Sequence, residues 1–310
     1  MNPGGADRTT AGGAALRRER ALRWLLRAAG LALAVWLTPV MLELLGRHML
    51  YPAPSVPVPS PPPPPLEEVA LELPSGDAVS AWARSSSETE GGASTRGTPA
   101  VLFFHGNGEN LETMRWAGLY DQLAALGVHS LAVDYPGYGR SGGSPSEASL
   151  TAAGEAGFAW LEERHPEAPK VVLGWSLGAA VAVQVAVRHP GETDALVLLS
   201  AWGDLQSLAS NYFPRFLVGM ALEDRYDSRS RAAEIRAPVL MIHGEDDRII
   251  PIAHGRRLHR ALPEGTRFVA VSGTGHNDLL GRQVVWDELG AFFRSPALRA
   301  AVEGGGIENR

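Results

Sequence analysis

The segment that most constrains the fold of this chain is KVVLGWSLGAA, which runs from Lys170 to Ala180. Its apolar first half has the composition of a buried strand, and its alanine-rich end has that of a helix. A one-residue corner at Ser176 joins the two, with glycines two residues before and two residues after it. A serine at such a corner is held in a strained geometry, with its hydroxyl exposed above the sheet. Because Gly-x-Ser-x-Gly also occurs by chance in a chain with 35 glycines, the interpretation depends on partners further along the chain.

The composition excludes several classes of protein. A chain of 310 residues with average hydropathy has room for one large α/β domain and an appendage. It contains no cysteine, which rules out a disulfide scaffold, a cysteine nucleophile and a thiolate metal site. The formal net charge is −6 and the only lysine is Lys170, so we expect no nucleic-acid-binding surface. No His-x-x-x-His pattern or carboxylate cluster indicates a metal, and we expect no cofactor.

Residues 1–50 differ from the rest of the chain. Six arginines between positions 8 and 27 precede the stretch from Ala28 to Gly46, whose one charged residue is Glu43. As a helix this stretch would be about 28 Å long, close to the about 30 Å of a bilayer core, which predicts an uncleaved membrane anchor. The positive-inside tendency then places the remaining chain on the non-cytoplasmic side. A cleaved signal peptide, or an amphipathic helix that packs on the domain or lies at the bilayer surface, is the alternative.

Residues 51–65 are dense in proline and end in five consecutive prolines. Such a run favours polyproline II, so we expect a semi-rigid spacer that holds the following domain a few tens of ångströms from the membrane. A ligand for an SH3-type domain is the functional alternative for the same run.

Residues 66–298 are predicted to form one α/β domain, and residues 299–310 a C-terminal tail. Apolar runs alternate with helix-like segments, which indicates a mainly parallel sheet with helices on both faces. Two short runs within residues 66–83, separated by Pro-Ser-Gly-Asp, predict an antiparallel hairpin at the sheet edge. We expect one continuous helix from residue 110 to residue 126. Residues 201–236 have no clean period and are interpreted as a small helical cap inserted over the site.

Residues with the chemistry of a catalytic triad follow the corner in the order Ser, Asp, His. After Ser176 come His-Gly-Glu-Asp-Asp behind one strand and Gly-Thr-Gly-His-Asn-Asp-Leu behind the last strand. This is the chain order of an α/β-hydrolase triad. A serine hydroxyl is a poor nucleophile without an adjacent base, and an imidazole needs a carboxylate to fix its tautomer.

From Tyr51 onward the chain resembles the α/β-hydrolase superfamily. Within it, the chain is similar to the membrane-anchored group that includes depalmitoylating abhydrolase-domain enzymes and bacterial relatives. The motifs that carry the resemblance are RHMLYP after the expected anchor, FFHGNGEN, DYPGYGRSGG, GWSLGAA, RYDSRSRAAEIRAPVLMIHGEDDRIIP and GTGHNDL. The resemblance implies that Ser176 is the nucleophile, that His276 is the base, and that Asp247 rather than Asp246 is the orienting acid.

The same resemblance implies an oxyanion hole formed by the backbone N–H groups of Asn107 and Leu177. Asp134 and Asp278 border the expected site and are the substitutes for the triad acid. Trp175, inside the corner, either lines an acyl pocket or packs in the core, and the sequence does not distinguish these roles.

Together these patterns predict a serine hydrolase that cleaves ester or thioester bonds through an acyl-enzyme intermediate. The expected anchor favours a lipid-like or other acyl substrate, since it would hold the site near a bilayer. An amide-cleaving peptidase of the same fold and a non-catalytic, membrane-tethered binding module are the alternatives. The sequence does not indicate an oligomeric state.

Overall fold

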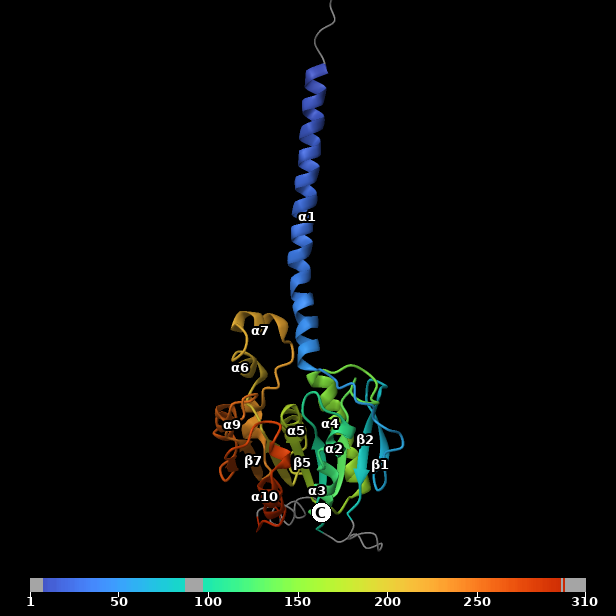
Figure 1. The fold of residues 1–310 in the computed structure, drawn as a ribbon, viewed down its shortest axis with the longest axis vertical. Coiled ribbons are helices and arrows are strands. Elements are labelled where there is room, and N and C mark those ends of the chain that lie inside the picture. The colour runs from blue at the N-terminus through green and yellow to red at the C-terminus, as the bar shows by residue number, and fades with distance from the viewer. Residues whose placement is uncertain (1–7, 87–96, 297, 299–310) are drawn as a thin grey trace, which may run out of the picture.

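An eight-stranded sheet forms the centre of the domain in the computed structural model, which describes residues 8–86, 97–296 and 298 (Figure 1). The strand order is β1-β2-β4-β3-β5-β6-β7-β8. Strands β3 to β8 are parallel to one another, and the β1–β2 hairpin pairs antiparallel with β4 at one edge, as predicted. The strands are β1 (Glu67–Glu72), β2 (Ala78–Arg84), β3 (Ala100–Phe104), β4 (His129–Val133), β5 (Lys170–Trp175), β6 (Ala195–Leu199), β7 (Val239–Gly244) and β8 (Arg267–Val271).

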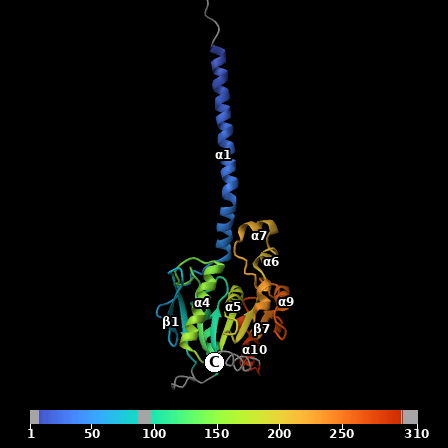
Figure 2. The ribbon, with the colours of Figure 1, turned by 180° about the vertical axis from the view of Figure 1, so that it is seen from behind.

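Helices cover both faces of this sheet, which gives the α/β-hydrolase arrangement that the sequence predicts (Figure 2). Helices α4 and α5 pack on one face, and α2, α3 and α10 pack on the other. The helices are α1 (Arg8–Leu50), α2 (Leu111–Trp116), α3 (Leu119–Ala125), α4 (Glu147–Arg164), α5 (Leu177–Arg188), α6 (Leu205–Ala209), α7 (Arg215–Ala221), α8 (Ser228–Arg231), α9 (Ile252–His259) and α10 (Gln283–Phe293), with 3₁₀ turns at Ala232–Glu234 and Leu279–Gly281.

The central strands are buried on both sides. In β5, Val172 points into the core beneath α4 and α5, while Val171 and Leu173 point into the core on the opposite face. Successive side chains of a strand alternate between faces, so a strand covered on both sides has to be apolar at every position. This explains the continuous apolar run before the corner at Ser176.

The predicted helix from residue 110 to residue 126 is two helices, and that expectation is wrong. Asn110 caps α2 as its side chain accepts a 3.0 Å hydrogen bond from the Thr113 N–H. Helix α2 ends at Trp116, and α3 begins after Gly118, whose φ of 79° is left-handed. A left-handed residue cannot continue an α-helix, and glycine adopts this conformation at little cost.

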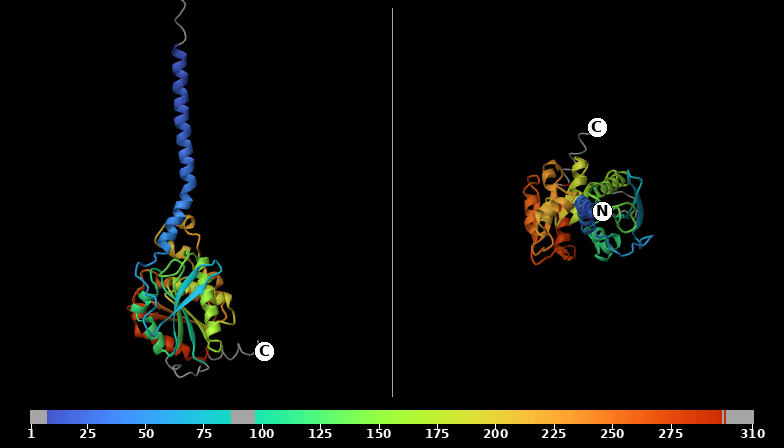
Figure 3. Two further views of the ribbon diagram at one scale, coloured as in Figure 1. Left: turned by 90° about the vertical axis from the view of Figure 1, so that its right-hand side faces the viewer. Right: turned by 90° about the horizontal axis from the view of Figure 1, so that it is seen from above.

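Helix α1 extends from one end of the domain as a single rod (Figures 1 and 3). It contains residues 28–46, for which the sequence predicts a membrane span. Within the part of the chain that the structure describes, no helix is long and apolar enough to cross a membrane. The helical conformation of the stretch agrees with the prediction, whereas the predicted crossing is not supported.

The proline-dense segment 51–65 does not form the spacer that its composition predicts. Tyr51 and Val58 are buried against the domain, and the Asn110 side-chain amide donates a 2.8 Å hydrogen bond to the Val56 carbonyl. The segment therefore runs along the domain surface and holds the base of α1 against it. Proline content correctly predicts that the segment has no helix or strand, but the buried partners that dock it are distant in sequence.

Residues 201–236 form a group of short helices at the end of the domain from which α1 projects (Figures 1 and 2). Helices α6 and α7 stand highest, and α7 packs beside the last turns of α1. Helix α8 and the 3₁₀ turn return the chain to β7. The predicted tail, residues 299–310, lies outside the described residues.

Candidate active site

Ser176 occupies the corner between β5 and α5 alone. Its backbone has φ 57° and ψ −117°, a region that costs a non-glycine residue about 1–3 kcal/mol. The flanking glycines explain how β5 and α5 can approach each other so closely at the corner. A Cβ on Gly174 would overlap the Gly178 carbonyl, and a Cβ on Gly178 would overlap the Phe104 carbonyl of the adjacent strand. The Gly-x-Ser-x-Gly pattern is therefore a packing requirement, and burial of strand and helix holds the strained serine in place.

The structure brings Ser176, His276 and Asp247 into one hydrogen-bonded chain. The Ser176 Oγ lies 3.0 Å from the His276 Nε2, and the His276 Nδ1 lies 2.7 Å from the Asp247 Oδ2. The three residues come from the corner and from the loops after β8 and β7, which meet because the carboxyl ends of parallel strands share one edge. All three are almost fully buried.

Asp247 is held as a carboxylate. Its Oδ1 accepts hydrogen bonds from the N–H groups of Ile249 (3.0 Å) and Ile250 (2.7 Å). Its Oδ2 faces the Nε2 atom of His243 at 3.4 Å as well as His276. Burial acts to raise the pKa of Asp247, but hydrogen bonds from His243 and His276 outweigh it and lower the pKa below its usual range.

The other acidic residues considered from the sequence have different surroundings. Asp246 is exposed to solvent. Asp278 accepts a 3.1 Å hydrogen bond from the Gly275 N–H and so braces the loop that carries His276. Asp134 lies beneath the loop after β3, facing His105. Of the four acids, Asp247 is the one in contact with the imidazole of His276.

The loop after β3 passes directly beside Ser176. A Cβ on Gly106 would lie 3.1 Å from the Trp175 ring and 3.6 Å from the Ser176 Cβ, so only glycine fits without displacing the ring. The backbone N–H groups of Asn107 and Leu177, the predicted oxyanion donors, form no hydrogen bond with any described part of the chain. Both are thus free to donate to a substrate.

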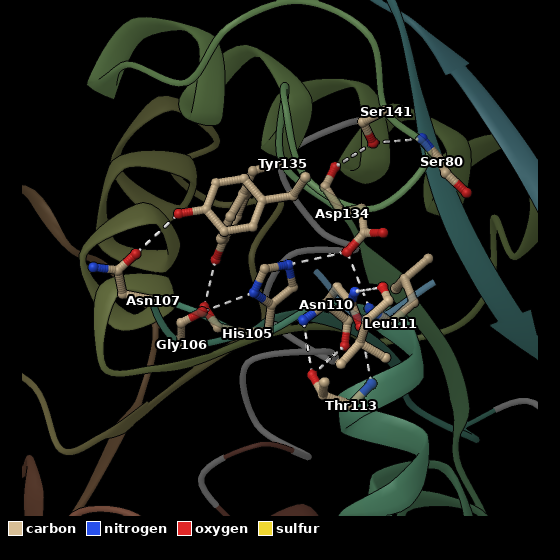
Figure 4. A network of polar contacts seen from close by, with 12 residues as sticks. Ser80, His105, Gly106, Asn107, Asn110, Leu111, Thr113, Asp134, Tyr135 and Ser141 are labelled. Atoms are coloured by element: carbon tan, nitrogen blue, oxygen red, sulfur yellow. Dashed lines mark hydrogen bonds and ion pairs between the residues drawn. The ribbon is translucent and has the colours of Figure 1, made fainter. Parts of the chain in front are cut away.

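A buried polar network fixes this loop from below (Figure 4). The Tyr135 hydroxyl donates to the His105 carbonyl at 2.6 Å, and the His105 Nδ1 donates to the Gly106 carbonyl at 2.8 Å. The His105 Nε2 lies 3.3 Å from the Asp134 Oδ1, which also accepts from the Leu111 N–H at 3.0 Å. Burial raises the pKa of Asp134 despite these partners.

Two residues in contact with the site were not assigned to it by sequence reasoning. Trp175 stacks on the His276 ring, with 5.6 Å between ring centroids and 28° between planes. His243 touches Asp247, with 3.4 Å between the His243 Nε2 and the Asp247 Oδ2. Its position four residues before that acid, at the end of β7, is the sequence signal that could have indicated the contact.

No metal centre is built from the residues that the structure describes, since no three His, Cys, Asp or Glu side chains there are grouped to hold an ion.

Comparison with known proteins agrees with this fold. A family model described as "alpha/beta hydrolase fold" matches residues 99–231, and one described as "TAP-like protein" matches residues 221–303. The uncharacterized protein Rv2307c of Mycobacterium tuberculosis is 36% identical over 258 residues, 81% of this chain and 88% of that protein. The chain belongs to the α/β-hydrolase superfamily. The first matched region of this hydrolase contains the corner, and the second contains Asp247 and His276.

More distant similarities include esterases and lipases. The lysophosphatidylserine lipase ABHD12 of the zebrafish Danio rerio is 32% identical over 177 residues, 52% of this hydrolase and 46% of that lipase. The solved structure of an esterase of Pyrococcus furiosus has a TM-score of 0.57 at 17% identity and covers 74% of this hydrolase and 90% of the esterase chain. At that identity the structural similarity shows the fold alone.

Proposed function

We propose that this hydrolase cleaves carboxylic ester or thioester bonds, with Ser176 as nucleophile, His276 as general base and Asp247 as orienting acid. The observation that carries the proposal is the unbroken hydrogen-bonded chain from the Ser176 hydroxyl through the imidazole to the buried carboxylate. As the Ser176 Oγ attacks the carbonyl carbon, His276 takes its proton and then delivers it to the departing alcohol or thiol. A water molecule, deprotonated by the same imidazole, then releases the acid from the acyl-enzyme.

The oxyanion that forms during attack would be stabilised by the N–H groups of Asn107 and Leu177. Leu177 is the first residue of the twelve-residue helix α5, so the positive end of the helix dipole supports its N–H. Removing one such fixed donor typically lowers the rate about a hundredfold or more. The buried network around His105 and Asp134 supports the proposal because it holds the Asn107 loop without using those residues in the chemistry.

A lipid-like or other acyl substrate fits this hydrolase best. The name of the zebrafish relative, a lysophosphatidylserine lipase, points to a lipid ester. Helix α1 also carries large apolar side chains that are more than half exposed, such as Trp24, Leu31 and Trp36. Exposed apolar side chains of this kind indicate an interaction surface, and we propose that α1 associates with a lipid bilayer. The arginines on the amino side of its apolar stretch are the ground on which we propose that the domain lies on the non-cytoplasmic side.

Hydrolysis by the purified full chain tests the reaction. We expect turnover of p-nitrophenyl esters and acyl thioesters, and a loss of at least about 10⁴-fold in Ser176→Ala. Faster cleavage of matched amides than of esters would favour the peptidase alternative. Absence of any turnover in the wild type would favour the binding module.

Location is tested separately. The full chain should float with phosphatidylcholine vesicles in a density gradient. A reporter fused to the C-terminus that is active only in the cytoplasm should be inactive, and activity of that reporter would contradict the proposed orientation.

A further inference from the structure

A groove lined by apolar residues lies where the last turns of α1 meet the cap helices α6 and α7. Its volume is about 290 Å³, just below the about 300–1,000 Å³ typical of small-molecule sites. Leu45, Met49 and Leu50 of α1 form one wall, and Ala209 and Leu217 are among the cap residues that form the other. Every residue that lines the groove is apolar. A ligand in this groove would contact hydrocarbon side chains and would receive no hydrogen bond from them.

Specific contacts hold the α1 wall in place. The Tyr51 hydroxyl, at the end of α1, donates a 2.7 Å hydrogen bond to the Asp224 Oδ2 and lies 2.8 Å from the Tyr226 hydroxyl, and all three residues are buried. Gly46 allows the two helices to touch, because a Cβ there would overlap the Ala221 carbonyl oxygen. The groove is therefore a built feature of the junction between α1 and the cap.

The foot of the groove contacts the loop after β3, which passes beside the catalytic corner. The Leu50 carbonyl, at the foot of the groove, accepts a 2.5 Å hydrogen bond from the Asn107 side-chain amide. The preceding residue of that loop, Gly106, packs against Ser176. The foot of the groove thus lies beside the proposed oxyanion hole.

We propose that this groove binds the hydrocarbon chain of the acyl group while its carbonyl lies at Ser176, so that α1 supplies one wall of the substrate site. The inference rests on the proposed function. A hydrocarbon chain matches the apolar lining, and each methylene buried there strengthens binding. The concave shape between α1 and the cap, and the contact of its foot with the Asn107 loop, favour a single chain over a bilayer surface or a second copy of the protein.

Narrowing the groove tests the proposal with the full chain. Ala209→Trp fills it from the cap and Met49→Trp fills it from α1. Met220→Trp on α7 and Leu44→Trp on α1 are matched controls, since both positions are exposed and lie outside the groove. The readout is the ratio of kcat/KM for p-nitrophenyl dodecanoate to that for p-nitrophenyl butanoate.

In the filled variants we expect this ratio to fall at least about tenfold, which corresponds to excluding about two buried methylene groups. In the controls it should stay within about twofold of the wild-type ratio. An unchanged ratio in both filled variants, or an equal fall in the controls, would overturn the proposal.

A binding measurement separates this proposal from the proposed function. The Ser176→Ala chain should bind a fluorescent dodecanoyl ester, followed by anisotropy, and Ala209→Trp in that background should weaken its Kd about tenfold. If the wild type hydrolyses no ester but this difference is seen, the proposed function fails and the groove proposal stands. If the filled variants lose vesicle binding and keep the chain-length ratio, the groove is a membrane-docking surface and the acyl proposal is wrong.

Discussion

The corner at Ser176 and the junction of α1 with the cap both depend on a glycine that lets two elements touch. At the corner, Gly174 admits the Gly178 carbonyl, and at the junction Gly46 admits the Ala221 carbonyl. The corner is formed within five consecutive residues, whereas the junction joins positions more than 170 residues apart in sequence. Geometry that is set locally can be predicted from a motif, while geometry set by distant partners cannot.

The two regions also differ in what holds them. The corner is almost fully buried and stores backbone strain. The junction combines a largely exposed ion pair between Arg47 and Glu223 with the buried contacts of Tyr51. An exposed ion pair contributes little to stability, so Tyr51 is the main polar link between α1 and the cap. Burial raises the pKa of the Tyr51 hydroxyl far above its usual range.

The largest expected effect is on catalysis at the corner. Asp247→Asn removes the charge that stabilises the protonated imidazole and favours the wrong tautomer, so kcat for butanoate ester hydrolysis should fall about 10⁴-fold. The adjacent Asp246→Asn is the matched control, since Asp246 is exposed, and its kcat should be close to that of the wild type. An equal loss in both variants would mean that the acid has been misassigned.

The next largest effect is on the stability of the corner. Gly178→Ala forces a methyl group into the Phe104 carbonyl and should lower the free energy of unfolding by about 3 kcal/mol, measured by urea denaturation. Gly219→Ala in α7 meets no atom within 4 Å and should leave stability unchanged or raise it by up to about 1 kcal/mol. Similar values for the two variants would show that the corner tolerates separation of strand and helix.

A smaller effect is expected at the junction. Gly46→Leu pushes α1 away from α7 and should cost about 1–2 kcal/mol, because the cap can move where the corner cannot. Amide hydrogen exchange in α7 should become faster while that in β5 stays unchanged. Gly30→Leu, with no atom within 4 Å, is the control and should leave exchange in α7 as in the wild type. Faster exchange in β5 would show that the junction and the corner are not independent.

The smallest effect concerns pH. The pKa of Asp247 is lower in the folded protein than the about 3.9 of an unfolded chain. Its ionised form therefore stabilises the fold above about pH 4, and this contribution is lost as the pH falls through the folded-state pKa. The difference in unfolding free energy between wild type and Asp247→Asn should therefore shrink as the pH falls below about 4. A difference that stays unchanged there would contradict the assigned ionisation.

Motifs in the sequence were sufficient to predict the fold class, the edge hairpin and the residues that meet at the corner. They work there because a close backbone approach requires glycine and a strand buried on both faces requires an apolar residue at every position, and both patterns are visible in the sequence. The break at Gly118 was missed because a single glycine inside a helical pattern is often tolerated. The docking of residues 51–65 was missed because proline predicts stiffness and carries no information about Asn110, Asn107 or Asp224, which hold that segment and the foot of α1.

Covalent labelling tests the central claim most directly. The full chain, incubated with a fluorophosphonate probe and digested, should carry one adduct on the peptide that contains Ser176, and a folded Ser176→Ala variant should carry none. An unlabelled wild type, or an equal adduct in the two proteins, would contradict the assignment of Ser176 as the nucleophile.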